Sequence, residues 1–546
     1  IDGPEFDGAL VDWDEMFKRM GTFKDVEREE MEHFEEHLAT VEAAKKKEST
    51  DVTMDVEPTN ESVAELTNRD AEWRKALRAS MKPKERTAIE RVKMPELDPV
   101  YRATTRTEEV NIGLTKEMAL TEAKRCLDCP KPSCMEGCPV NINIPSFVKN
   151  IERGQFLAAA KVLKNTSALP AVCGRVCPQE KQCESRCVHL KMNKPAVAIG
   201  YLERFAADYE RQSGNISIPE KEPANGIKVA VVGSGPAGLS FAGDMAKKGF
   251  DVTVFEALHE IGGVLKYGIP EFRLPNAIVD VEIENLQKMG VKFVADCIVG
   301  KTIGVKELEK QGFKGIFVAS GAGLPNFMNI PGENALNIMS SNEYLTRVNL
   351  MDAANPHTDT PINLGKNVVV VGGGNTAMDS CRTAKRLGAN VTLVYRRSEA
   401  EMPARLEEVK HAKEEGITFL TLHNPKEYEA DEKGAVKSVI LDVMQLGEPD
   451  ASGRRRPEAT GETIKLECDQ VIVAVGVSPN PLVPQSIEGL ELGRKNTIAV
   501  NEQMQSSQPA IYAGGDIVRG GATVILAMGD GRKAALNMAQ QLKPEA

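Results

Sequence analysis

Two glycine-rich units, each with the order strand, tight turn, helix and strand, constrain the fold more than any other feature of this chain. The first runs from the apolar stretch IKVAVVG into the turn GSGPAG, and the second from KNVVVV into GGGNTAMD. Their first glycines, Gly233 and Gly372, are 139 residues apart. Bare glycines between a strand and a helix let the backbone reach a pyrophosphate at the helix N-terminus. The sequence therefore predicts an α/β fold with two Rossmann-like, dinucleotide-binding domains.

The first unit has the features of an FAD site. Glu256 ends its second strand, 23 residues after Gly233, where a carboxylate can accept hydrogen bonds from a ribose diol. A late segment, YAGGDIVRGGATVILAMG, places Asp516 after a strand and a glycine pair, as in FAD-binding reductases. The FAD candidates in these two segments are Gly233, Gly235, Pro236, Ala237, Gly238, Glu256, Gly515 and Asp516.

The second unit favours NADPH over NADH. Its second strand ends in Tyr395, Arg396 and Arg397 rather than in an acid. A carboxylate at this position would repel the 2′-phosphate of NADP, whereas a guanidinium can hold it with paired, charge-assisted hydrogen bonds. The alternative is that these arginines only solvate the end of a strand. The NADPH candidates are Gly372, Gly373, Gly374, Asn375, Thr376, Ala377, Arg396, Arg397 and Gly476.

Eight of the eleven cysteines lie between residues 126 and 187, which favours a metal site over disulfides. The first four follow the spacing C-x2-C-x4-C-x3-C-P, and the next four C-x3-C-x5-C-x3-C. Iron-sulfur clusters need converging thiolates on short loops, so two clusters are expected, with structural zinc as the alternative. In two-cluster ferredoxins the cysteine before proline ligates the other cluster, so Cys138 is expected to join the second group.

A disulfide reductase would share both nucleotide-binding units but needs a redox-active cysteine pair beside the flavin. The three remaining cysteines, Cys297, Cys381 and Cys468, stand alone in the sequence and are expected to be small buried hydrophobes. The net charge of -11 argues against a basic nucleic-acid-binding face. Since no run of about 18 apolar residues exists to cross a bilayer and no secretory signal is present, the cytoplasm is the expected location and no membrane partner is expected.

Changes in composition divide the chain into four expected parts. Residues 1–90 form a charged helical extension or connector, with helices at 13–48 and 63–81. Residues 91–222 form a helical domain with two [4Fe-4S] clusters, in which Ala196–Gln212 is the clearest helix. The FAD-binding domain takes residues 223–345 and 480–546, and the NADPH-binding domain residues 346–479.

The cysteine groups, GSGPAG, GGVLKYGIPEFRLP, GGGNTAMD with YRR, and VIVAVG with AGGD together resemble the small subunit of NADPH-dependent glutamate synthase. The resemblance runs from about residue 124 to the C-terminus. Relatives of similar layout are the N-terminal half of dihydropyrimidine dehydrogenase and the large subunit of NADH-dependent reduced ferredoxin:NADP oxidoreductase, a bifurcating transhydrogenase. The resemblance implies an enzyme that moves electrons between NADPH, FAD and two [4Fe-4S] clusters.

The same resemblance implies specific ligands. One cluster takes Cys126, Cys129, Cys134 and Cys187, and the other takes Cys138, Cys177, Cys183 and, on the following helix, Glu203, which leaves Cys173 as a spare. Further FAD contacts are implied for Gly262, Gly263, Leu265, Tyr267, Gly268, Ile269, Thr523 and Val524. No catalytic side chain is required, because the flavin itself carries the hydride transfer.

The resemblance implies two alternative electron acceptors. One is the glutamate synthase large subunit, and the other is ferredoxin together with NAD, reached through a ferredoxin-reductase-like flavoprotein subunit. The first residues, IDGPEFDGALVDWDEM, resemble the C-terminal end of such a flavoprotein subunit. A fusion of that subunit upstream of this chain is therefore expected, with residues 13–90 as the connector. A non-redox scaffold with structural zinc and degenerate nucleotide folds is the alternative from a different functional class.

Overall fold

The computed structural model describes residues 59–355, 357–449 and 455–543. The helix expected at 13–48 and the first residues, with their resemblance to a flavoprotein subunit, lie outside the described residues. None of the helices in the described part of the chain is long and apolar enough to cross a membrane.

Short helices make up the cysteine-rich part of the chain, and α12 at Ile199–Ser213 is the longest of them, close to the helix predicted there. The helix predicted at 63–81 is two helices, because the chain turns at Asn68, whose side chain accepts a hydrogen bond from the backbone of Asp70. The other elements are α3 Val63–Thr67, α4 Glu72–Ser80, α5 Pro83–Ala88, α6 Pro99–Arg102, α7 Lys116–Lys124, α8 Ser133–Glu136, α9 Ile144–Glu152, α10 Phe156–Lys164, α11 Pro170–Val176, η2 Gln179–Lys181, η3 Glu184–Arg186 and η4 Val188–Met192.

Helices α4 and α5 pack against the cysteine-rich helices through buried ion pairs. The carboxylate of Asp128, two residues after Cys126, is fully buried and accepts hydrogen bonds from Arg74 at 2.6 Å and Arg78 at 2.7 Å. Arg86 pairs with Glu152 at 2.8 Å. The last part of the predicted connector is thus integrated into the helical domain, since a buried charge keeps its stability only with its partner.

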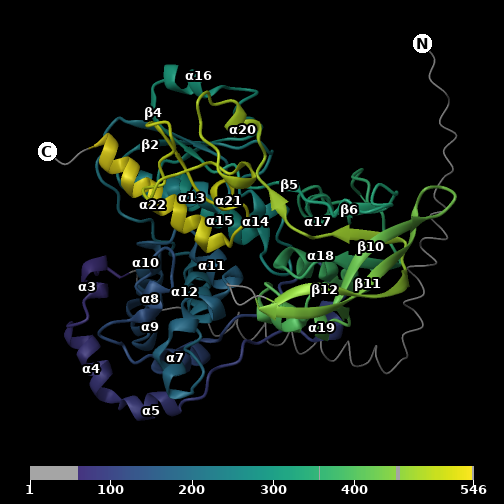
Figure 1. Ribbon diagram of the computed structural model, residues 1–546. Helices are drawn as coiled ribbons and strands as arrows, with labels where there is room; N and C mark the ends of the chain where they lie inside the picture. The colour runs from purple at the N-terminus through teal and green to yellow at the C-terminus, as the bar shows by residue number, and fades with distance from the viewer. Residues whose placement is uncertain (1–58, 356, 450–454, 544–546) are drawn as a thin grey trace. The chain divides into compact units, whose positions relative to one another are not determined.

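The first glycine unit builds a five-stranded parallel sheet of order β15-β4-β1-β2-β3. Its central strand β1 is buried after its first residue, as expected for valine-rich parallel strands covered on both faces. Helices α13 and α22 lie side by side against this sheet (Figure 1). The elements are β1 Lys228–Val232, β2 Asp251–Phe255, β3 Lys292–Val294, β4 Phe313–Val318, β15 Ile511–Ala513, α13 Pro236–Lys247, α14 Val264–Tyr267, α15 Asn276–Lys288, α16 Val305–Lys310, α20 Leu482–Gln485, η7 Arg494–Asn496, α21 Asp516–Arg519 and α22 Val524–Leu542.

The second glycine unit builds a parallel sheet of order β6-β13-β7-β8-β9. A three-stranded antiparallel sheet, β10-β11-β12, is attached to it, and β11 and β12 form a long hairpin (Figure 1). The elements are β6 Ile338–Ser340, β7 Asn367–Val371, β8 Asn390–Tyr395, β9 Thr418–Thr421, β10 His423–Ala430, β11 Val436–Pro449, β12 Arg455–Glu467, β13 Gln470–Val473, α17 Ser341–Leu345, the π-helical turn η5 Thr346–Leu350, α18 Asn375–Arg386, η6 Glu399–Glu401 and α19 Leu406–Glu414.

The second nucleotide-binding domain is inserted into the first. The chain crosses between them at β5, Leu324–Pro325, and returns at β14, Val477–Ser478, and these two crossing strands pair with each other. The predicted boundary at 345/346 placed β6 with the FAD-binding segment, whereas β6 pairs with β13 in the second sheet. A three-residue strand with no glycine turn gives no sequence signal of which sheet it joins.

Buried ion pairs connect the helical domain and both nucleotide-binding domains. Glu415, after α19, accepts five hydrogen bonds from Arg102, Arg382 and Arg386. Arg273, before α15, pairs with Asp379 on α18 at 2.6 Å.

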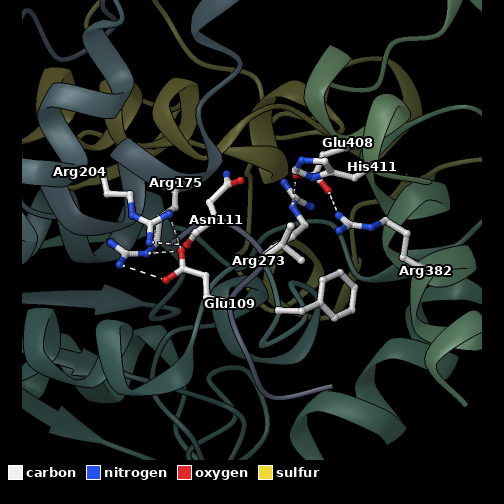
Figure 2. A pocket seen from close by; sticks show the side chains of 10 residues that line it. Glu109, Asn111, Arg175, Arg204, Arg273, Arg382, Glu408 and His411 are labelled. Carbon is white, nitrogen blue, oxygen red and sulfur yellow. Dashed lines mark hydrogen bonds and ion pairs between the residues drawn. The ribbon is translucent and has the colours of Figure 1, made fainter. Parts of the chain in front are cut away.

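A small cavity lies within this ion-pair network. Arg175 and Arg204 turn toward Glu109 on one side of the cavity, and Arg382 turns toward Glu408 on the other (Figure 2). Such pairs fix the domains in one arrangement, because separating them would leave charges without partners.

Candidate cofactor-binding sites

The turn GSGPAG is shaped for close approach of the backbone. Gly233 has φ +101°, and a Cβ on it would lie 2.5 Å from the carbonyl oxygen of Ala319. Gly235 caps α13, whose N-terminal N–H groups favour an anion. The Glu256 carboxylate accepts hydrogen bonds from the backbone N–H of Ser234 at 2.8 Å and from its hydroxyl at 2.5 Å. The backbone N–H of Leu258 also donates to Glu256, at 3.0 Å, so the carboxylate holds the glycine turn in place and keeps one lone pair for a ribose.

The other predicted FAD segments converge on this turn. A Cβ on Gly263 would lie 2.9 Å from the Cα of Gly235, and one on Gly515 would lie 3.0 Å from the Cβ of Ala237. Burial, with nearby Asp516 and Glu256, raises the pKa of Tyr267 to about 12. Among the other predicted FAD residues, Leu265 and Ile269 are buried, Gly262 and Gly268 flank α14, Pro236 and Gly238 lie in the first turn of α13, and Thr523 caps α22 just before Val524. The three glycine segments together form a cradle that fits a dinucleotide.

The second glycine turn has the same construction. Gly372 has φ +144°, and a Cβ there would lie 2.4 Å from the carbonyl oxygen of Ala474. A Cβ on Gly374, the N-cap of α18, would meet nothing within 4 Å, so space remains in front of the helix. The side chain of Asn375 accepts a hydrogen bond from the backbone N–H of Arg405, and Gly476, with φ +110°, directly precedes β14. In the same turn Gly373 and Ala377 are buried and Thr376 is exposed.

The two predicted phosphate-binding arginines lie directly after β8. Arg396 is exposed, and the Nε of Arg397 donates to the carbonyl oxygen of Arg455 at 3.1 Å. The neighbouring Arg455 was not among the predicted residues, and its position at the start of a distant strand gives no local motif that could have revealed it. An exposed guanidinium at the end of the second strand is chemically suited to a 2′-phosphate.

Four of the predicted cluster ligands line a single small cavity. They are Cys126, Cys129, Cys134 and Cys187, and we call them the outer cysteine group. Four converging sulfurs around one space are the donor set that a [4Fe-4S] cluster requires. Three of these four cysteines are partly exposed.

The remaining predicted ligands gather around Glu203, and we call Cys138, Cys177, Cys183 and Glu203 the inner group. Burial is the main cause of the raised pKa of the Cys138 and Cys183 thiols, and the nearby Glu203 carboxylate contributes to both. Glu203 is 6% exposed, its Oε1 has no hydrogen-bond partner in the described structure, and burial raises its pKa to about 8. A buried carboxylate oxygen without a partner is costly unless something binds it, so Glu203 fits a ligand position.

Cys173 also lies beside the inner group. It is fully buried, and its Sγ is 3.5 Å from the Sδ of Met528 on α22. The structure thus brings both alternatives, Glu203 and Cys173, to the same place. The unpartnered carboxylate oxygen favours Glu203, and Cys173 already has an apolar sulfur contact.

Contacts that the sequence did not reveal connect the inner group to the predicted FAD site. The side chain of Gln182, next to Cys183, donates to the hydroxyl of Thr523 at 3.4 Å. A Cβ on Gly529 would lie 2.9 Å from the Cβ of Pro139, which follows Cys138. The loops that carry the inner group therefore pack directly on the start of α22. These contacts join residues more than 300 positions apart, so no local sequence motif predicts them.

Cys297, Cys381 and Cys468 are all buried, as predicted. No pair among these three is near enough to form a disulfide in the described structure, since each packs separately as a small apolar side chain.

The fold and sites define a class of protein, a flavoprotein oxidoreductase with two nucleotide-binding domains and a cysteine-rich helical domain. Residues 227–531 match the family model of pyridine nucleotide-disulphide oxidoreductases. Residues 102–215 match the model of dihydropyrimidine dehydrogenase domain II, 4Fe-4S cluster.

Whole-chain comparisons identify the family. The glutamate synthase [NADPH] small chain of Azospirillum brasilense is 35% identical over 452 residues, which cover 81% of this chain and 93% of that protein. The NADPH-Fe(3+) oxidoreductase subunit beta of Geobacter sulfurreducens is 36% identical over 437 residues, or 75% of this chain and 64% of that one. The structure of Mycobacterium tuberculosis FprA in complex with NADPH has a TM-score of 0.50 at 20% identity, covering 58% of this chain and 85% of FprA. The chain belongs to the family of the glutamate synthase small chain.

Family membership confirms the predicted fold, enzyme class and cofactors. The chain is an NADPH-linked oxidoreductase with FAD and [4Fe-4S] iron-sulfur chemistry. The comparisons do not favour the zinc scaffold or the disulfide reductase, and the separate burial of the last three cysteines agrees with this.

Proposed function

We propose that this chain is the NADPH-linked electron-transfer subunit of a larger complex, with electrons passing between the FAD site, the inner group, the outer cysteine group and a partner protein. The observation that carries the proposal is the packing of Gln182 and Pro139 on Thr523 and Gly529, which joins the cluster loops to the FAD site. The partly exposed outer cysteine group is the side of the helical domain that a partner could reach.

The residues have separate roles in this proposal. The three glycine segments hold the FAD diphosphate and ring, and Glu256 both fixes the turn and accepts the ribose hydroxyls. The turn at Gly372–Ala377 holds the NADPH diphosphate, while Arg396 and Arg397 bind the 2′-phosphate. Bound FAD would supply the hydride acceptor for NADPH and the one-electron donor for the iron-sulfur clusters. Each cluster has its own set of four ligands, with Glu203 completing the inner group.

The direct test is anaerobic titration of the purified chain with NADPH, followed by flavin absorbance and low-temperature EPR. We expect the flavin to bleach first and two cluster signals to develop, with two clusters by iron analysis. A chain that binds no flavin, or that shows no iron-sulfur signal, would contradict the proposal.

Ligand assignment in the inner group is tested with a matched pair of variants, Glu203→Ala and Cys173→Ser. We expect Glu203→Ala to lower the iron content and change one EPR signal, and Cys173→Ser to leave both unchanged. The reverse pattern would assign Cys173 as the fourth ligand.

The names of the relatives favour a protein partner, since they are a small chain and a beta subunit. We propose a glutamate synthase large subunit as that partner, because the match covers 93% of a glutamate synthase small chain. The test mixes the NADPH-reduced chain with such a subunit, glutamine and 2-oxoglutarate, and measures glutamate. Reduction of ferredoxin that depends on added NAD, with no glutamate formed, would instead support the bifurcating assignment.

A further inference from the structure

A cavity of about 350 Å³ lies next to the FAD-binding segment, and none of the predicted nucleotide-binding residues lines it. Its walls come from residues 106–107, from 270–276, from 348–352 and from the C-terminal half of α18. We propose that this cavity binds a small zwitterion of the α-amino acid class. Its volume lies in the range of about 300–1,000 Å³ that is usual for small-molecule sites.

Two polar groups in the wall have no partner within the described structure. Arg106, which is half-buried, forms no hydrogen bond or ion pair with any described residue. Its neighbour Thr105 is fixed, because its carbonyl oxygen accepts a hydrogen bond from Arg386 at 2.9 Å. Thr383 is 2% exposed, and its hydroxyl has no hydrogen-bond partner. A buried hydroxyl without a partner, beside a guanidinium that pairs with no described residue, points to a ligand that satisfies both.

The backbone of the wall is also unusual. Val348 and Asn349 lie in the π-helical turn η5, and Asp352 has φ +47°. Single π-turns and positive φ at non-glycine residues occur preferentially at functional sites. The side chain of Asn349 donates to the carbonyl oxygen of Tyr267 at 3.3 Å, so the wall is connected to the predicted FAD contact.

The cavity is separate from the NADPH site. Thr383 is eight residues beyond Asn375, the first residue of α18. At a rise of about 1.5 Å per residue it lies about 12 Å along the helix from the glycine turn.

The charges in the wall select the ligand class. Arg106 can hold a carboxylate with two parallel hydrogen bonds. Glu271 and Asp352 add two carboxylates, which accept hydrogen bonds from the backbone of Asn276 at 3.2 Å and from the side chain of Asn355 at 2.7 Å. Arg386 also lines the wall, but its charge is already paired with Glu415 at 2.7 Å. These acids would repel a dianion and can accept hydrogen bonds from an ammonium group, while Arg106 would repel a simple amine. A zwitterion satisfies both signs, and Pro270 and Val348 in the wall add apolar surface for its side chain.

The test is calorimetric and NMR titration of the full chain, with its cofactors, against the twenty standard amino acids. For each one that binds, the carboxylic acid lacking the amine and the amine lacking the carboxylate are compared; for leucine these are 4-methylpentanoate and isoamylamine. We expect at least one amino acid to bind with Kd near or below 1 mM, and both analogues to bind at least about 10-fold more weakly.

Variants test the two unpartnered groups. We expect Arg106→Ala and Thr383→Val to weaken binding at least about 10-fold, and Thr383→Ser to restore it, because serine keeps the hydroxyl. Arg456→Ala, which removes an exposed arginine on β12, serves as the control and is expected to change nothing. Flavin content and thermal unfolding show whether each variant is folded, and Arg106→Lys replaces Arg106→Ala if the latter is not.

Three outcomes would overturn the inference. They are that no standard amino acid binds with a Kd near or below 1 mM, that the amine-free acid binds as tightly as the amino acid, or that a folded Arg106 variant binds as well as the parent. All three readouts measure binding alone, so they do not depend on electron transfer from NADPH.

Discussion

Replacing Glu415 with glutamine should destabilise the packing of α18 against α19 more than replacing a nearby exposed residue does. Its carboxylate is completely buried and accepts five hydrogen bonds from three arginines. Although burial acts in the opposite direction, Arg382 and Arg386 hold the pKa of Glu415 well below its usual range. Glutamine has nearly the same size but is neutral, and its single carbonyl oxygen accepts at most two of the five hydrogen bonds.

The expected loss can be worked out from these contacts. Three charge-assisted hydrogen bonds disappear, and at about 1.5 kcal/mol each they amount to about 4.5 kcal/mol. This agrees with the loss of about 3–5 kcal/mol that follows when a buried ion pair loses one partner. Arg382 keeps its bond to Glu408 and Arg102 its bond to Glu414, so the interface is weakened and not abolished.

Native-state hydrogen exchange of peptides covering α18 and α19 measures this loss locally, without assuming that the whole chain unfolds in one step. The control is Glu399→Gln, whose ion pair with Lys413 is about half exposed and contributes less than about 1 kcal/mol. The reasoning is refuted if both variants change the opening free energy of these helices by the same small amount.

Three further predictions concern other sites. The double variant Arg396→Ala, Arg397→Ala should raise the KM for NADPH in dye reduction about 10- to 100-fold, because charge-assisted bonds to the 2′-phosphate are lost. The KM for NADH should stay unchanged, and equal effects on the two cofactors would argue against the phosphate role. In Gly529→Ala the new Cβ would lie 2.9 Å from the Cβ of Pro139, which would disturb the contact between the cluster loops and α22. We expect stopped-flow traces with unchanged flavin reduction but slower cluster reduction. Unchanged cluster reduction would contradict electron transfer from the FAD site to the inner group. Glu408 is buried, which would raise its pKa, yet Arg273 and Arg382 lower it to about 2. The stabilisation that ionised Glu408 gives the fold is therefore present above the ordinary pKa near 4.5 and lost as the pH falls toward 2. The difference in unfolding free energy between the parent and Glu408→Gln should shrink over this range, and a constant difference would count against this prediction.

The local parts of this molecule could be predicted from the sequence. Gly233 and Gly372 have positive φ and lie close to the backbone after a neighbouring strand, which only glycine allows. Because this requirement involves a few consecutive residues, it appears in the sequence as a glycine-rich motif. The spacing of the cysteines similarly indicated two groups of ligands. The proline after Cys138 indicated that this cysteine belongs with the second group. Arg396 and Arg397 could be picked out as candidate phosphate-binding residues because they directly follow the second strand of the second glycine unit.

Long-range contacts could not be predicted. The pairing of β6 with β13 depends on which sheet edge is free, which short strands do not encode. The contacts of Glu415 with Arg102 on α6 and with two arginines on α18 combine residues up to 313 positions apart. Glu203 has no spacing signal of its own and was found only through the resemblance, because a ligand on a helix after the cysteine loops looks like any other helical glutamate.

The insertion of one nucleotide-binding domain into the other has a consequence for biosynthesis. The strand β15 and the helix α22, which complete the first sheet and the FAD cradle, are translated only after the whole inserted domain. Because domains tend to fold as they emerge from the ribosome, the inserted domain can fold while the first still lacks its last strand. Loading of the flavin is therefore expected to be one of the last steps in the maturation of this polypeptide, after the site for the pyridine nucleotide has formed.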